Sequence, residues 1–193
     1  PMSSHHTVRE NQEPALLIED LFLIDEEDLG QLLEWSPTIV IEERTMDLLD
    51  ARGYKFDIVF TKNAIDASQE NLKVISYDVA FLKAAIEYLI AHQYKAVNIV
   101  SDQLDLGYYR AYLEQINIVL FSKGFRYYFV KTGFTKWKAE GERILIVSAD
   151  KDEDIKRTGL TKINEKEYEM ENDGLFILEF SHVKYILIGE KIT

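Results

Sequence analysis

The stretch from residue 78 to residue 121 shows the clearest alternation of hydrophobic patterns in the chain. Apolar residues recur at helical spacing between Phe81 and Ile90, which predicts an amphipathic helix. Asp78 precedes this segment, and we expect its carboxylate to cap the first turn. The apolar run Ala96–Val100 is too short for a helix and too apolar for an exposed edge. It therefore predicts an interior strand of a parallel sheet that helices cover.

The first 77 residues show the same alternation of strands and helices. Four acids at residues 25–28 favour the start of a helix, and Pro37 stops that helix. Leu29, Leu32, Leu33 and Trp35 are expected to form its apolar face. A second helix is expected around residues 46–49 and ends before Gly53, a typical residue after a helix. Short β-branched or apolar runs predict strands at residues 15–18, 38–41, 56–60 and 72–75.

The pattern changes after residue 121. Residues 104–115 predict one more helix, and residues 116–121 predict a strand that forms a hairpin with residues 125–130 through Ser122-Lys123-Gly124. Further strands, at 144–147, 168–170, 175–180 and 183–188, have no amphipathic helix among them. The fold class is therefore predicted to be α/β. A helix-covered, mainly parallel sheet domain would span residues 1–124, and a small all-β, sandwich-like domain would span residues 125–193.

Composition and charge restrict the class of partner. The net charge of −12 argues against nucleic acids and anionic membranes, because Lys and Arg mediate binding to both. No apolar run approaches the roughly 20 residues that span a bilayer, and no signal peptide is evident in the polar N-terminal segment. The absence of cysteine excludes a thiolate metal site. We therefore expect a cytoplasmic protein with neither a nucleic acid polymer nor a membrane as partner.

Four regions of the sequence carry a family resemblance. They are Ser3–His6 with Glu13–Ile18, Gly30–Pro37, Tyr94–Val100 and Phe134–Trp137. These stretches resemble thiamine pyrophosphokinases, most closely the bacterial branch, over nearly the whole chain. The resemblance implies transfer of a pyrophosphoryl group from ATP to thiamine with Mg²⁺, by a homodimer with active sites between its subunits. Ligands of open α/β sheets bind outside the carboxyl ends of strands, so we expect a ligand site in the segments that follow the strands.

The residues after the strands depart from the pattern of that family. Glu43-Arg44 stands where the family has Asp-Gly, and residues 61–64 stand where it has Gly-Asp-x-Asp. Lys62 therefore reverses the charge at a position that would hold a metal. Ala80-Phe81 replaces Thr-Asp, and residues 164–173 lack the Ser-Asn loop that contacts thiamine in the family. No glycine-rich phosphate loop of the Walker or dinucleotide type is present.

The remaining polar residues after the strands are candidate site residues. Asp102 and Asp105 are the catalytic candidates. Asp105 matches the family aspartate under one placement of the alignment gap around residues 101–106. The alternative interpretation of this pair is a solvated turn with a helix cap. Glu43 and Asp105 are the candidate metal ligands, since Mg²⁺ prefers carboxylate oxygens. The candidate nucleotide-binding residues, on the loops expected to face a nucleotide, are Glu43, Arg44, Lys62 and Gln103.

These departures favour a thiamine pyrophosphokinase-like protein with weak or no catalysis and a binding or regulatory role. Thiamine or a nucleotide is the expected small-molecule partner, a homodimer is expected, and Mg and ATP are expected as cofactors only if the protein is active. The alternative is an active thiamine pyrophosphokinase whose Mg-ATP site has been rearranged, with Glu43, Asp102 and Asp105 converging on one pocket. A third reading is a nucleotide-utilising enzyme with another substrate. A salt bridge between Lys62 and Glu43 would instead indicate a closed structural pair.

Overall fold

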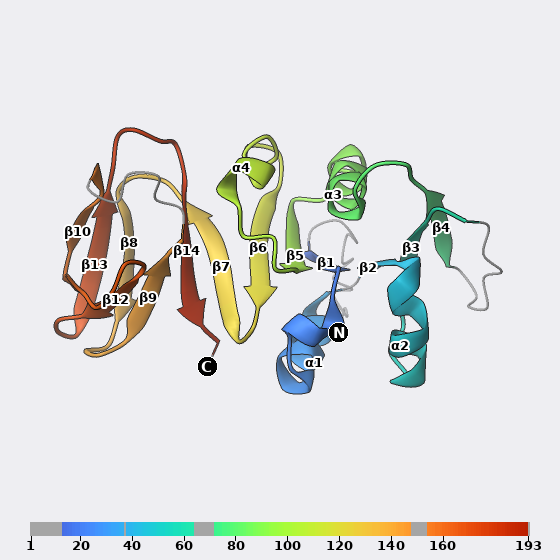
Figure 1. The fold of residues 1–193 in the computed structure, drawn as a ribbon, viewed down its shortest axis with the longest axis horizontal. Helices are drawn as coiled ribbons and strands as arrows, with labels where there is room; N and C mark the ends of the chain where they lie inside the picture. The colour runs from blue at the N-terminus through green and yellow to red at the C-terminus, as the bar shows by residue number, and fades with distance from the viewer. Residues whose placement is uncertain (1–12, 37, 64–71, 148–153, 193) are drawn as a thin grey trace, which may run out of the picture.

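A computed structural model describes residues 13–36, 38–63, 72–147 and 154–192. One sheet of eleven strands runs through the molecule in the order β11-β12-β9-β14-β7-β6-β5-β1-β2-β3-β4, and a second sheet has the order β10-β13-β8 (Figure 1). No helix in these ranges is long and apolar enough to cross a bilayer.

The first half of the chain forms the parallel part of the large sheet. Its strands are β1 (Ala15–Ile18), β2 (Ile39–Glu42), β3 (Ile58–Thr61), β4 (Lys73–Ser76), β5 (Ala96–Val100) and β6 (Asn117–Ser122). Its helices are α1 (Glu26–Trp35), α2 (Met46–Ala51), α3 (Phe81–Ala91) and α4 (Leu106–Tyr109), with 3-10 turns η1 (Leu21–Leu23) and η2 (Glu43–Thr45). Figure 1 shows α1 and α2 on one face of this part and α3 on the other.

Helices bury both faces of the parallel strands, which explains the continuous apolar runs in the sequence. In β1, Leu16 and Ile18 belong to one core cluster with residues of α1 and α2. Ala15 and Leu17 belong to the opposite cluster, with Phe81 and other residues of α3. The prediction of β5 as an interior strand is confirmed, because it lies between β1 and β6 and is parallel to both.

The second half of the chain is made of strands. They are β7 (Phe125–Val130), β8 (Phe134–Lys138), β9 (Arg143–Ile146), β10 (Lys156–Thr158), β11 (Leu160–Lys162), β12 (Glu167–Met170), β13 (Gly174–Glu179) and β14 (Ile186–Lys191). The three-stranded sheet packs on the large one, since Phe176 and Leu178 share a core cluster with Ile144, Tyr168 and Ile186. The predicted class, an α/β part followed by a sandwich-like β part, is confirmed.

A tight hairpin joins the two halves. Lys123 and Gly124 both have positive φ, 53° and 78°, as the two central residues of a type I′ turn require. β7 pairs with β6 on one side and with β14 on the other, so the large sheet continues across the predicted boundary. The division at residues 124 and 125 stays a prediction.

Three local predictions are wrong. Asp78 does not cap α3, whose N-cap is Ala80 without a side-chain hydrogen bond, because the helix begins three residues after Asp78. The helix predicted over 104–115 is limited to α4, and turns with i→i+3 bonds follow, such as Tyr112 N to Tyr109 O at 2.8 Å. Trp35 is 75% exposed and does not belong to the apolar face of α1.

Candidate functional site

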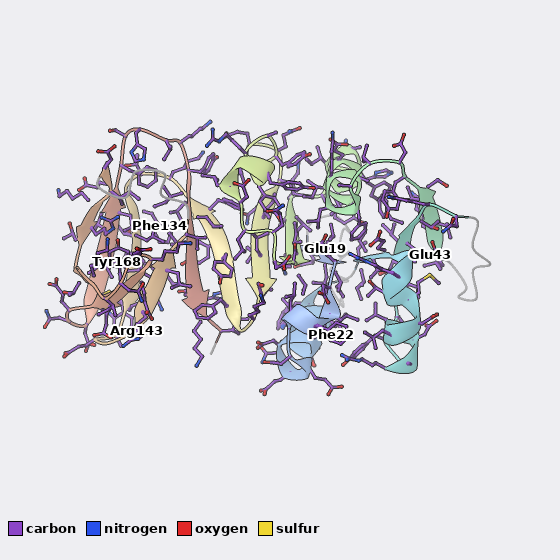
Figure 2. The ribbon with its side chains drawn as sticks, in the orientation of Figure 1. Glu19, Phe22, Glu43, Phe134, Arg143 and Tyr168 are labelled. Carbon is purple, nitrogen blue, oxygen red and sulfur yellow. The ribbon has the colours of Figure 1, made fainter. Side chains whose placement is uncertain are left out.

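The topological switch point of the parallel sheet lies between β1 and β5. From β1 the chain adds strands toward β4, whereas from β5 it continues to β6 on the other side. Ligands of open α/β sheets bind in the crevice at such a point, outside the carboxyl ends of the strands. Figure 2 labels Glu19 near the end of β1, and Glu43 farther along the sheet, next to α2.

A hydrogen bond connects the segments on the two sides of the switch point. Ser101, fully buried after β5, donates from Oγ to Glu19 Oε2 at 2.5 Å. The same Oγ accepts from the backbone N–H of Gln103 at 3.0 Å, and Glu19 N donates to Val100 O at 3.0 Å. The carboxylate of Glu19 therefore serves to connect two loops at the position where a ligand of this fold class would bind.

A hollow of 450 Å³ opens beside the ends of β2 and β3. Thr61 Oγ1 donates to Glu43 Oε2 at 2.5 Å, and Asn63 Nδ2 lies 3.4 Å from the same oxygen. Glu43 is thus held by the strand that follows it in the sheet. The residues that line the hollow are Glu42, Glu43, Arg44, Asp47, Phe60, Thr61, Lys62, Asn63 and Tyr77.

Glu42, in the same hollow, is also held from two directions. Arg44 Nε lies 2.5 Å from Glu42 Oε2, and the Tyr77 hydroxyl donates to Glu42 Oε1. Burial, and then the hydrogen bond to Glu42, raises the pKa of Tyr77, so the phenol stays protonated as the donor. Lys62 Nζ lies 5.2 Å from the centre of the Tyr77 ring, in a cation–π contact.

The loop after β5 places its carboxylates differently. Asp105 is the N-cap of α4 and accepts from Gly107 N at 2.8 Å through Oδ1. Gln103 Oε1 accepts from Asp105 N at 3.3 Å, and Asp102 is exposed. Asp105 therefore already has a structural role, whereas any catalytic role of Asp102 or Asp105 stays a prediction.

The structure brings some of the candidate residues together and keeps others apart. Glu43, Arg44 and Lys62 share the hollow, but β1 separates β2 from β5, so two strand spacings of about 4.8 Å intervene before Asp102 and Asp105. Within the described ranges, no three His, Asp or Glu side chains are grouped as a metal site. Asp102 and Asp105 are not among the residues that line this hollow, so the convergence of Glu43, Asp102 and Asp105 that the alternative requires is not seen there.

The oxygens at the strand ends do not fit a magnesium–triphosphate group. Mg²⁺ usually binds one or two carboxylates together with phosphates. Here Glu42 is already bound by Arg44 and Tyr77, and one oxygen of Glu43 accepts two side-chain hydrogen bonds.

Three residues of the site had not been anticipated from the sequence: Glu19, Glu42 and Tyr77. Glu19 follows the apolar run of residues 15–18 directly, so the same inspection of strand ends would have found it. The contact of Tyr77 with Glu42 joins residues 35 positions apart and leaves no local signal in the sequence.

Several solved structures share this fold. Thiamine pyrophosphokinase from Bacillus subtilis has a TM-score of 0.61 at 16% identity, over 94% of this chain and 100% of that chain. The enzyme from Candida albicans has a TM-score of 0.64 at 12% identity, over 95% of this chain and 90% of that chain, and the yeast enzyme has 0.58 at 10%, over 96% and 88%. No family model and no curated protein matches the chain. Identities this low show the fold alone.

Proposed function

We propose that this chain is a thiamine pyrophosphokinase-like protein with weak or no pyrophosphoryl transfer, kept for a binding or regulatory role as a cytoplasmic homodimer. One observation carries the proposal: the two glutamates at the end of β2 are engaged within the chain. Glu42 is held by Arg44 and Tyr77, and Glu43 by Thr61 and Asn63. A metal ion would have to displace these contacts before it could bind.

The cations of the hollow oppose a metal as well. Arg44 and Lys62 both line it, and Lys62 stands where the resemblance would place a carboxylate. A divalent and a monovalent cation ~4 Å apart repel each other by roughly 2 kcal/mol in water and several times more at an effective dielectric constant of 20. Phosphoryl transfer depends on positioning and on neutralising the charge of the phosphates, so the loss of a metal site removes the main source of rate.

The hollow remains suitable for a small ligand. Its 450 Å³ lies within the range of roughly 300–1,000 Å³ that is typical of ligand sites, and it combines aromatic walls with several polar groups. Thiamine or a nucleotide bound without Mg²⁺ is the occupant that we propose.

A turnover experiment tests the proposal. The protein is incubated with thiamine, ATP and Mg²⁺, and thiamine diphosphate is measured by chromatography, with the B. subtilis enzyme as the positive control. We expect no product above the background without protein. Product that disappears in Glu43→Gln but persists in Glu179→Gln would support the alternative, an active enzyme with a rearranged site, because Glu179 lies in the β half and pairs with Lys156.

A further inference from the structure

A second group of charges lies where the two halves of the chain meet. Glu114 is in the turns that lead from α4 to β6, Lys131 follows β7, and Lys184 and Tyr185 precede β14. Lys184 Nζ lies 2.7 Å from Glu114 Oε1, Lys131 Nζ lies 3.8 Å from it, and the Tyr185 hydroxyl donates to the same oxygen. Three donors of the β half therefore surround one carboxylate oxygen from the α/β half. We call Lys131, Lys184 and Tyr185 the donor cradle.

The donor cradle is accessible and adjoins open space. The side chains of Glu114, Lys131 and Lys184 are 52%, 58% and 63% exposed. Two hollows of 350 and 380 Å³ lie on either side of Glu114 and Tyr185. They lie near the amino end of β6, at the opposite end of the parallel strands from the candidate site.

The two hollows differ in chemistry. Four apolar residues line the first hollow, together with Asn117 and Lys131. The four are Leu113, Ile116, Ile118 and Phe129. The second contains Arg110, His182 and Lys184. Lys131 Nζ and Lys184 Nζ also lie 5.2 and 5.9 Å from the centre of the Tyr185 ring, so both ammonium groups are near one phenol. An apolar surface thus lies next to convergent donors of positive charge.

The local field favours an anion in a chain whose net charge is −12. Arg110, Lys131 and Lys184 line these hollows, and Glu114 is the one acidic residue among the described residues that line them. Hydrogen bonds from Lys184, and then from Tyr185, lower the pKa of Glu114 to about 2. A charged carboxylate at this point is therefore strongly preferred over the protonated form.

We propose that the donor cradle binds the carboxylate or phosphate group of a small organic anion, and that Glu114 occupies this position when no such ligand is bound. The apolar part of the ligand would pack against the partly buried Phe129 and Leu113 in the first hollow. Glu114 is half exposed and lies on a segment of turns, so its side chain can leave the cradle by rotation. Because the internal carboxylate competes for the same donors, it lowers the apparent affinity of the ligand. The inference does not depend on the proposed function, since it concerns another site.

The test uses the full chain at low ionic strength, where screening is weak. Binding of benzoate, phenyl phosphate and inorganic phosphate is measured by calorimetry and by shifts of backbone amide signals. We expect Glu114→Gln to bind both organic anions about tenfold more tightly than the unmodified protein, because the competing carboxylate is gone. The amide shifts should include residues 113–118, 129–131 and 182–185. Inorganic phosphate distinguishes a site for the anionic group alone from a site that also uses the apolar hollow.

The matched control is Glu179→Gln. Glu179 is 50% exposed and pairs with Lys156 at 2.8 Å. Its replacement by glutamine changes the net charge by the same amount as Glu114→Gln does. It should leave anion binding unchanged. In the Glu114→Gln background, Lys184→Met and Tyr185→Phe should each reverse the gain.

Two outcomes would overturn the inference. One is equal binding by Glu114→Gln, Glu179→Gln and the unmodified protein. The other is a gain that persists without Lys184 and Tyr185. Glu114→Ala provides a second version of the first comparison if the glutamine variant has an altered melting temperature.

Discussion

Glu190 is the most buried charged residue among those that the structure describes, with 2% of its surface exposed. Its Oε1 accepts from Arg126 Nε at 2.7 Å and from Lys136 Nζ at 2.5 Å, and Lys138 Nζ lies 3.3 Å from Oε2. The carboxylate of Glu190 thus lies near three cations between the two sheets of the β half, one of which, Lys138, also pairs with Glu142 at 2.8 Å. Breaking such a group by removing one partner leaves uncompensated charge in a poorly solvated place.

Glu190→Gln is expected to lower the free energy of unfolding by about 3–5 kcal/mol at pH 7. Burial acts to raise the pKa of Glu190, but the hydrogen bonds from Lys136 and Arg126 outweigh it and hold the pKa below 4.5. The folded-state pKa is the lower one, so the stabilisation is complete above pH 4.5 and decreases as the pH falls toward the folded pKa. The difference between the two proteins should therefore shrink in acid.

Urea unfolding of both proteins at pH 7 and at pH 3.5 measures this difference. Glu179→Gln is the control, since its ion pair is exposed and should contribute less than about 1 kcal/mol. A Glu190→Gln variant as stable as the unmodified protein at pH 7 would contradict the assigned role.

The helices differ in how they begin. α1 begins with a side-chain cap, because Asp25 Oδ1 accepts from Asp28 N at 2.8 Å. α3 begins after Ala80, which has extended φ and ψ of −69° and 139° but no side chain that can accept a hydrogen bond. The longest helix described therefore lacks a cap at a position whose backbone conformation already suits one.

Ala80→Asp should raise the free energy of unfolding by about 1 kcal/mol, because the new carboxylate can accept from a free N–H of the first turn. Asp78→Ala should change it by less than about 0.5 kcal/mol, since Asp78 is exposed and lies outside the cap. Thermal or urea unfolding of the two variants measures both effects. A large loss of unfolding free energy in Asp78→Ala would contradict this account and indicate that Asp78 caps α3 after all.

Most strands of the parallel half could be predicted, because their apolar runs are too short to be helices and are bounded by polar residues. β8 could not, because its pattern is inverted. Lys136 and Lys138 point toward Glu190 inside the sandwich, while Trp137 between them is 59% exposed. β10 and β11 have three residues each and depend on their pairing with β13 and β12, which no local pattern encodes.

The location of the candidate site was more predictable than its contacts. The rule that ligands bind after strand ends pointed to Glu43, Arg44 and Lys62, which do share a hollow. The hydrogen bond from Ser101 to Glu19 joins residues 82 positions apart, so only the folded chain reveals it. The sequence therefore pointed to these three residues, but it missed Glu19, Glu42 and Tyr77 and left the contacts undetermined.

The whole molecule is organised by one continuous sheet. β7 pairs with both β6 and β14, and Tyr127 and Leu187 from the β half share a core cluster with Ile118 and Leu120 from the α/β half. The candidate site lies at the carboxyl ends of the parallel strands, and the donor cradle lies at the other end. The two proposed ligand sites therefore lie at opposite ends of the same sheet.

Calorimetric titration of ATP in the presence of Mg²⁺ tests the central claim most directly. The protein is titrated with and without a chelator, beside the B. subtilis enzyme as a positive control. The engaged carboxylates beside β2 and β3 predict that Mg²⁺ adds nothing to ATP binding. Micromolar binding of ATP that requires Mg²⁺ and is lost in Glu43→Gln would contradict it.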